Sequence, residues 1–165
     1  MGGDEYGLFL ANVKLEILPL DISLKICYHN PAANKTRREN AMILTLDIGN
    51  TNIALGGFFG GELVFSAKMA SNPTLTGDEY ACKLLDILSL YGVNPNRVEG
   101  AILSSVVPAL NQSMASAVQA ACGVTPLVVG PGVKTGLGIR CDDPVSVGSD
   151  LICACVAAKS CCNRL

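Results

Sequence analysis

The sequence predicts an α/β fold whose elements follow the order β-β-β-α-β-α-β, with a mixed sheet and a last helix after it. Three observations predict this class: apolar runs of strand length separated by Gly-rich turns, two helical patterns, and an apolar strand pattern after each of those helices. Half of the 165 residues are apolar and 16% are charged, so the chain can bury a sizeable core. Strands joined by short turns pair antiparallel and strands joined by helical crossovers pair in parallel, so the sheet is expected to be mixed.

The first three elements are expected to form an antiparallel meander. The apolar runs at residues 42–48 (MILTLDI), 53–59 (IALGGFF) and 62–69 (ELVFSAKM) have strand character. A Gly-Asn-Thr-Asn turn joins the first two runs, and a Gly-Gly turn joins the second to the third. Short turns of this composition are typical of β-hairpins.

Residues 76–92 (TGDEYACKLLDILSLYG) predict the first helix. Thr76 and Glu79 fit a capping box at its start, and Gly92 fits the stop signal at its end. One face of this helix is expected to be apolar. That face carries Tyr80, Leu84, Ile87, Leu88 and Tyr91.

A buried strand and a second helix are expected next. Residues 98–108 (VEGAILSSVVP) have the continuous apolar pattern of a strand covered on both faces, and Pro108 ends it. Residues 109–122 (ALNQSMASAVQAAC) predict a helix of small residues that Gly123 closes.

The last strand and helix complete the predicted lobe. Residues 126–130 (PLVVG) predict a short strand, and a final helix is expected to begin near Gly148 or Ser149 and to run to the end of the chain. Residues 42–165 are therefore expected to form one lobe. Residues 1–41 pattern poorly and close on a polar, basic stretch, so we expect an extension or unstructured lead-in; a short accessory segment packed on the lobe is the alternative.

Charge and hydropathy argue against several classes of partner. The formal net charge of -2 and the pI near 5.3 give no broad electrostatic footprint for nucleic acid. No uncharged apolar run approaches the roughly 18 residues of a membrane span, and Asp4 and Glu5 stand where a secretory signal would be basic. We therefore expect a cytoplasmic protein with neither a nucleic-acid nor a membrane partner.

The eight cysteines are expected to be reduced thiols. Several lie in apolar periodic segments, and no signal peptide precedes them. The cluster at residues 153–162 (CACVAAKSCC) lacks paired C-x-x-C spacing. Core or incidental cysteine is therefore favoured over a metal site.

The turn after the first strand carries candidate chemistry. Asp47 ends an apolar strand, and Gly49, Asn50, Thr51 and Asn52 follow it closely. The backbone N–H groups and polar side chains of such a turn can face one anion, and Asp47 can hold Mg²⁺ directly or through water, because the metal bridges phosphate oxygens. The alternative is a generic turn, since Gly and Asn tolerate positive φ.

Four motifs, taken in order, closely resemble type III pantothenate kinase. They are DIGNTNIALG at 47–56, SSVVPAL at 104–110, GVKTGLGIRCDDP at 132–144 and VGSD at 147–150. The first of them, D-x-G-x-[TS] between two strands, also looks like the first phosphate motif of the actin-like ATPase fold. The resemblance extends from Met42 to about Ala158, and four ordered motifs are more specific than any one of them. It implies the N-terminal lobe of an actin-like (ribonuclease H-like) kinase, with the second lobe missing from this chain.

The resemblance also implies a reaction and a set of site residues. The family phosphorylates pantothenate with ATP, the first step of coenzyme A synthesis, and works as a cytoplasmic homodimer that needs Mg²⁺ and a monovalent cation (K⁺ or NH4⁺). The implied ATP phosphate loop consists of Asp47, Ile48, Gly49, Asn50, Thr51, Asn52, Ile53 and Ala54, with Asp47 at the metal. The implied pantothenate site consists of Cys141, Gly148, Ser149, Asp150 and Leu151.

Asp150 is implied as the base that takes the proton from the pantothenate hydroxyl. The local pattern independently suits this role, because Asp150 lies in the first turn of the last predicted helix, where the macrodipole favours a carboxylate. Phosphoryl transfer needs a positioned acceptor for the alcohol proton more than it needs a strong base. The alternative is that Asp150 is only a helix cap.

Two positions depart from the family pattern. Leu151 stands where the family has an arginine, and removing a guanidinium from an anion site forfeits a contact of roughly 1.5–3 kcal/mol. Cys141 stands where the family usually has a tyrosine, and the chain reaches Leu165 before a second D-x-G-T motif. A non-catalytic binding or regulatory protein derived from the lobe is therefore a second hypothesis beside the kinase. An actin-like kinase for another alcohol is a third.

Overall fold

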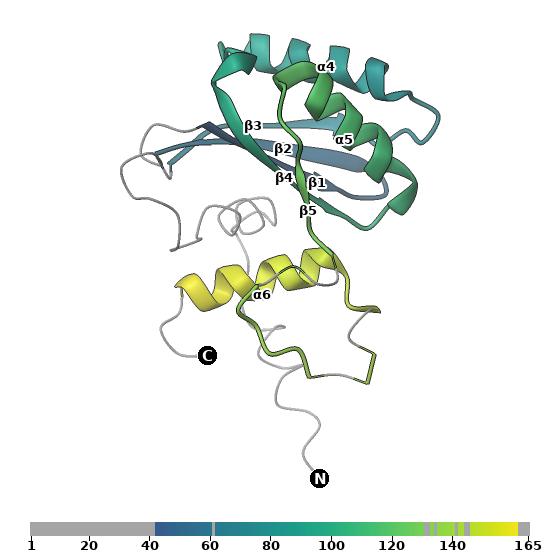
Figure 1. Ribbon diagram of the computed structural model, residues 1–165, viewed down its shortest axis with the longest axis vertical. Helices are drawn as coiled ribbons and strands as arrows, with labels where there is room; N and C mark the ends of the chain where they lie inside the picture. Colours follow the sequence, from purple (N-terminus) through teal and green to yellow (C-terminus); the bar gives the residue numbers. More distant parts are fainter. Residues whose placement is uncertain are drawn as a thin grey trace.

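The computed structural model describes residues 42–60, 62–130, 133, 135–140, 142–143 and 146–161. In this part of the chain a five-stranded sheet lies between two helical layers, with α4 and α5 on one face and α6 on the other (Figure 1). The elements are β1 (Met42–Ile48), β2 (Asn52–Phe59), β3 (Glu62–Ala70), α4 (Gly77–Leu90), the short 3₁₀ helix η1 (Pro95–Arg97), β4 (Val98–Ser105), α5 (Pro108–Cys122), β5 (Leu127–Val128) and α6 (Ser149–Cys161). The predicted lead-in at residues 1–41 lies outside the described residues.

The sheet is mixed, as the sequence predicts. Its strand order is β3-β2-β1-β4-β5, in which β1, β2 and β3 form an antiparallel meander. The strands that follow the helical crossovers pair in parallel, β4 with β1 and β5 with β4. The predicted element order β-β-β-α-β-α-β is therefore confirmed, as is the start of the last helix at Ser149, while residues 162–165, to which that helix was expected to run, lie outside the described residues.

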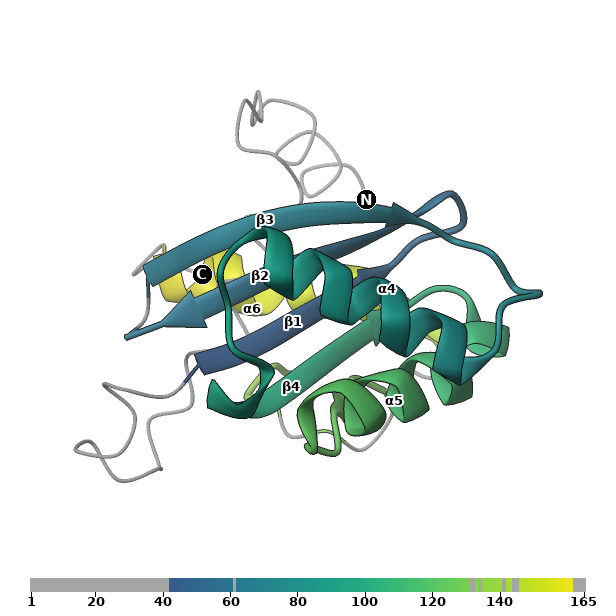
Figure 2. The same ribbon diagram turned by 90° about the horizontal axis from the view of Figure 1, so that it is seen from above.

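One face of the sheet forms the hydrophobic core against α4 and α5. Leu44, Leu46 and Ile48 of β1 alternate along the strand and are almost fully buried in this core. Figure 2 shows α4 and α5 side by side over the sheet, with α6 behind it. From the helices, the fully buried members of the core are Tyr80, Leu84, Leu88, Leu110, Met114, Ala117 and Val118.

The helix ends follow the predicted chemistry. The Thr76 backbone N–H donates to Glu79 Oε2 at 2.8 Å, and the Glu79 N–H donates to Thr76 Oγ1 at 3.3 Å, which is the predicted capping box. Gly92 and Gly123 take positive φ angles of 67° and 72° just after α4 and α5. Both glycines therefore supply the left-handed residue that ends a helix.

Three details differ from the sequence prediction. Strand β4 ends at Ser105 instead of 108, because Pro108 is the first residue of α5 and Val107 is its N-cap. Strand β5 is two residues long instead of five. Tyr91, which the sequence pattern placed on the apolar face of the first helix, lies just past the end of α4, is 45% exposed, and stacks on Phe65 with ring centroids 5.0 Å apart.

Among the helices of the described ranges, none combines the length and the apolar character that crossing a bilayer requires. The described cysteines Cys82, Cys122, Cys153 and Cys155 are free thiols. The predicted cluster at residues 153–162 extends beyond the described part of the chain, so the thiol of Cys162 lies outside it.

Candidate active site

Three of the four sequence motifs meet at one edge of the sheet. Strands β1 and β4 are parallel, so their carboxyl ends lie together, with Asp47 opposite Ser104 and Ile48 opposite Ser105. The first residue of α6, Ser149, hydrogen-bonds both of these serines. Segments about 40 to 100 residues apart in the sequence therefore surround one location.

The turn between β1 and β2 is held by hydrogen bonds on its inner side. The Gly49 N–H donates to the Asn52 carbonyl at 3.0 Å. Ser71, which follows β3, donates its hydroxyl to the Gly49 carbonyl at 2.6 Å and its N–H to the Thr51 carbonyl at 2.9 Å. The N–H groups of Asn50 and Thr51 make no hydrogen bond within the described part of the chain, and both residues are exposed. These two N–H groups are therefore available to an anion.

Gly49 is needed for space and not for positive φ. Among the described residues the positive φ angles belong to Gly60, Gly92, Gly123 and Gly136. A Cβ atom on Gly49 would lie 3.1 Å from the Asn52 carbonyl oxygen, closer than side chains normally approach. The close approach of the two turn residues, which the Gly49 N–H bond requires, is what favours glycine at this position.

The predicted phosphate-loop residues divide into two groups. Ile48 and Ile53 are fully buried and Ala54 is 5% exposed, so these side chains anchor the turn to the sheet. Asn50, Thr51 and Asn52 are exposed and can contact a ligand. Asp47 is half-buried at the end of β1. The family resemblance names all of these residues together. Their burial separates the residues that anchor the turn from those that can contact a ligand.

The side chain of Ser149 fastens α6 to the end of β4. Its Oγ accepts hydrogen bonds from Ser104 Oγ at 3.2 Å and the Ser105 N–H at 3.0 Å, and it donates to the Ser105 carbonyl at 2.9 Å. A hydroxyl has one proton and two acceptor positions, so these bonds use its full capacity. Ser149 is also 8% exposed. Its hydroxyl therefore positions the helix and cannot bind a substrate without giving up one of these bonds.

The carboxylate of Asp150 lies at the solvent-exposed start of α6. Its Oδ1 accepts from the Leu151 N–H at 2.8 Å. A Cβ atom on Gly148 would collide with that same oxygen, so glycine at 148 leaves room for the carboxylate. Leu151 is 58% exposed, directly beside Asp150. The other predicted substrate residue, Cys141, lies outside the described residues.

The carboxyl of Asp47 is affected by its burial and by two neighbouring side chains. Burial raises the pKa of the Asp47 carboxyl, a hydrogen bond with the Ser104 hydroxyl lowers it in part, and the negative charge of Asp150 raises it further. The site therefore brings together two carboxylates whose negative charges repel each other. A cation bound there would relieve this repulsion.

The buried thiol of Cys153 belongs to the same group of side chains. It lies one helical turn after Ser149 on α6 and is 2% exposed. Burial raises the pKa of this thiol, Ser104 lowers it in part, and the charges of Asp47 and Asp150 raise it further, so Cys153 is protonated at neutral pH. The Ser104 hydroxyl thus lies among Asp47, Ser149 and Cys153, with a single proton to donate.

Ser104, Ser105 and Ser71 have no role that the sequence pattern alone predicts. The first two stand in a quoted motif, but their place opposite Asp47 and Ile48 follows only from the parallel register. The signal for Ser71 is topological: β3 runs antiparallel to β2, and Asn52 pairs with Ala70, so the residue after Ala70 must lie beside the turn. A meander prediction extended by one residue could have found it.

The donor set at this edge fits a hard divalent cation. Mg²⁺ prefers oxygen ligands and is usually held by one or two carboxylates together with phosphate oxygens and water. Asp47, the predicted metal residue, supplies one such carboxylate at the end of β1. No group of three or more His, Cys, Asp or Glu side chains suited to a metal occurs among the described residues.

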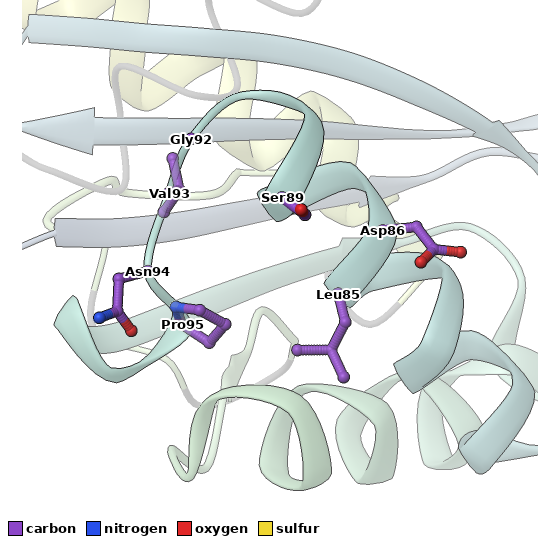
Figure 3. Close-up of a pocket in the computed structure, with 7 residues that line it drawn as sticks. All are labelled: Leu85, Asp86, Ser89, Gly92, Val93, Asn94 and Pro95. Atoms are coloured by element: carbon purple, nitrogen blue, oxygen red, sulfur yellow. The ribbon is translucent and has the colours of Figure 1, made fainter.

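A separate hollow lies at the opposite edge of the sheet (Figure 3). Its cavity volume is about 530 Å³, and its lining comes from the end of α4 and the segment before β4: Leu85, Asp86, Ser89, Gly92, Val93, Asn94 and Pro95. Because Val98 pairs with Met42 at the start of β1, this hollow lies far from Asp47 at the end of that strand. None of the predicted site residues lines it.

The strand order, with helices on both faces of a mixed sheet, defines the class: the described part of the chain has an actin-like ATPase fold. The chain belongs to the type III pantothenate kinase family, whose profile matches residues 43–164. The resemblance found in the sequence is thereby confirmed.

One curated relative and two solved structures are similar to this chain. A type III pantothenate kinase from Bifidobacterium animalis subsp. lactis (strain AD011) is 44% identical over 117 residues, which are 71% of this chain and 46% of the relative. This chain thus spans about half the length of that protein. A PilM–PilN type IV pilus biogenesis complex matches with a TM-score of 0.55 at 14% identity, over 86% of this chain and 50% of that one, which supports the fold alone. A Bacteroides thetaiotaomicron protein with an actin-like ATPase fold and unknown function matches with a TM-score of 0.45 at 11% identity, over 66% and 38% of the two chains.

Proposed function

We propose that residues 42–165 are the N-terminal lobe of a kinase that transfers the γ-phosphoryl group of ATP to pantothenate, giving 4'-phosphopantothenate in the first step of coenzyme A biosynthesis. The observation that carries this proposal is that Asp47 and the start of α6, which carries Asp150, both adjoin Ser104 at the edge where the turn exposes two unpaired N–H groups. Phosphoryl transfer depends on positioning and on charge stabilisation, and this edge offers groups for both. Membership of the family supports pantothenate as the acceptor.

In this proposal the turn binds the ATP phosphates. The backbone N–H groups of Asn50 and Thr51 donate to phosphate oxygens, and the side chains of Asn50, Thr51 and Asn52 add further contacts. Ser71 holds the Gly49 and Thr51 carbonyls away from the ligand. Phosphate oxygens therefore meet donors and not carbonyl oxygens, which would repel them.

Asp150 acts as the base in this proposal. The pantothenate hydroxyl oxygen attacks the γ-phosphorus, its proton passes to the Asp150 carboxylate, and the bond between the γ-phosphorus and the β-bridging oxygen breaks to release ADP. The carboxylate is exposed and so can reach a bound alcohol. Gly148 keeps space for it, and Ser149 fixes the helix that carries it.

Asp47 would hold Mg²⁺ in this proposal, directly or through water. The metal supplies charge neutralisation on the phosphate oxygens when it is bound. The repulsion between the two carboxylates favours a cation at this edge. A monovalent cation (K⁺ or NH4⁺), a homodimeric assembly and a cytoplasmic location follow from the family and are part of the same proposal.

A second candidate function is a non-catalytic binding or regulatory role. The observation in its favour is Leu151, which is 58% exposed beside Asp150 where the family pattern has an arginine. An exposed apolar side chain cannot pair with the carboxylate of pantothenate. The two functions are distinguished by whether pantothenate stimulates ATP cleavage.

The test is ADP release by the purified chain with ATP, Mg²⁺ and K⁺, in the presence and absence of pantothenate. The kinase proposal predicts pantothenate-dependent ADP release, which Asp150→Asn abolishes. Asp86→Asn is the matched control, since Asp86 is an exposed carboxylate on α4 that lines the distant hollow, and it should leave the rate unchanged. ATP binding with no response to pantothenate at any protein concentration would contradict the kinase and favour the regulatory role.

A further inference from the structure

The loop that follows β3 connects the β1–β2 turn to the buried face of α4. Ser71 is bonded to the turn at two points, through its hydroxyl to Gly49 and through its N–H to Thr51. The hydroxyl bond, at 2.6 Å, lies at the short end of the range for O–H···O bonds. The next residue, Asn72, is also held by two hydrogen bonds, both to Tyr80.

Tyr80 fixes the backbone of Asn72. The Asn72 N–H donates to the Tyr80 hydroxyl at 2.8 Å, and that hydroxyl donates to the Asn72 carbonyl at 3.0 Å. Tyr80 lies in the first turn of α4 and is fully buried. The ring packs in the core, so a phenylalanine would fill nearly the same space. The hydroxyl adds only the two bonds to Asn72, which it needs because a buried hydroxyl without partners is costly.

The direction of one turn N–H follows from these bonds. A peptide unit is planar and trans, so the carbonyl of one residue and the N–H of the next point in opposite directions. Because the Gly49 carbonyl points to the Ser71 hydroxyl, the N–H of Asn50 must point away from Ser71. The hydroxyl of Ser71 thereby sets the direction of a donor that the proposed function assigns to ATP phosphate.

We propose that Tyr80 and Ser71 are positioning residues for phosphate binding, joined through the backbone of Asn72 into a strut that runs from the core of α4 to the β1–β2 turn. The strut consists of Ser71, Asn72 and Tyr80. It rests on the proposed function, in that the turn is taken to bind the phosphates of ATP. Neither Tyr80 nor Ser71 is assigned any contact with ATP, and each acts through the turn.

The test measures binding of Mg·ATP, and separately of inorganic pyrophosphate, to the full chain by calorimetry. Tyr80→Phe and Ser71→Ala should each weaken binding about five- to tenfold, the effect of losing one or two neutral hydrogen bonds. The double variant should lose little more than either single variant, because both changes break the same connection. Ser71→Thr keeps the hydroxyl and should retain most of the affinity.

Tyr91→Phe is the matched control. Tyr91 also donates its hydroxyl to a backbone carbonyl, that of Ser66, at 2.9 Å, but it lies beyond the other end of α4 and is 45% exposed. Its removal should leave the affinity unchanged. Each variant is measured well below its own melting temperature, so that reduced stability does not mimic reduced affinity.

The outcomes separate the strut from the function on which it rests. If the unmodified chain binds neither probe, the proposed phosphate site is wrong and the strut falls with it. If the unmodified chain binds and Tyr80→Phe binds equally well, the strut is wrong while the phosphate site stands. If Tyr80→Phe and Tyr91→Phe weaken binding of the probes equally, both tyrosines only stabilise the fold, and this result would also overturn the proposal. Should Tyr80→Phe fail to fold, Ser71→Ala against Ser71→Thr decides.

Discussion

The two faces of the sheet are formed by the same strands, but one face buries apolar side chains and the other buries polar ones. On the face covered by α4 and α5, strand β1 presents Leu44, Leu46 and Ile48 to a continuous apolar core. On the other face the same strand presents Thr45 and Asp47, and there Asp47 meets Ser104 and the start of α6. Because side chains alternate along a strand, one run of seven residues serves both purposes. Burial on the first face supplies the stability that allows a poorly solvated carboxylate on the second.

The largest effect is expected at Asp150. Asp150→Asn should lower pantothenate-dependent turnover by roughly 10²- to 10⁴-fold, because the amide cannot accept the alcohol proton. Stability should hardly change, since the side chain is exposed and the asparagine oxygen can still accept from the Leu151 N–H. The measurements are kcat and a thermal melt. A fall in kcat of less than tenfold would remove Asp150 from its assigned role.

A substitution on the core face should have a comparable effect on free energy, but it should lower stability and not turnover. Leu46→Ala should lower the free energy of unfolding by about 2–5 kcal/mol, because Leu46 is 2% exposed within the core. Urea denaturation followed by circular dichroism measures this loss. The affinity of the remaining folded molecules for ATP should stay the same. A core substitution that weakened ATP binding without lowering stability would break the division between the faces.

A smaller effect is expected at Gly148. Gly148→Ala places a methyl group where the Asp150 carboxylate lies, so the carboxylate must move. A displacement of this kind should lower kcat roughly ten- to a hundredfold. The melting temperature should stay close to that of the unmodified chain, because the displaced group is a flexible, exposed side chain. A large fall in stability with unchanged kcat would show that the glycine serves the fold and not the site.

Local signals in the sequence predicted most of the fold. The bounds of β1 and the capping box of Thr76 and Glu79 depend on neighbouring residues, and both are confirmed. The ends of β4 and β5 were less predictable, since Val106, Val107 and Val129 have strand character but lie where the chain leaves the sheet. Tyr91 continues the apolar spacing of α4, yet the helix ends before it. Its ring stacks on Phe65 of the outermost strand, β3.

The candidate site was predictable in its residues but not in its internal contacts. Asp47 and Asp150 could be named from motifs, and the structure brings them together. The saturated hydroxyl of Ser149 could not be foreseen, because its partners on β4 are 44 and 45 residues away in sequence and depend on how α6 docks. The environment of Cys141 lies outside the described residues, so its predicted role stays a prediction.

The pH dependence of Asp47 gives the smallest effect, with a sign that can be worked out. Burial and Asp150 hold the pKa of the Asp47 carboxyl above its ordinary value of 3.8, despite the opposing bond with Ser104. The folded state therefore holds this proton more tightly than the unfolded state does, so the carboxylate lowers stability once the pH rises through this range. Asp47→Asn should thus raise the melting temperature near neutral pH, and the gain should vanish below about the ordinary pKa, where both side chains are neutral.

The melting temperature of Asp47→Asn at neutral pH, measured beside its ADP release, tests the contrast between the two faces most directly. The expected result is a chain that is more stable than the unmodified one and has lost pantothenate-dependent turnover, which would mean that Asp47 is kept for chemistry at a cost to the fold. A chain that melts earlier than the unmodified one at neutral pH would contradict this, because Asp47 would then be a structural partner of Ser104.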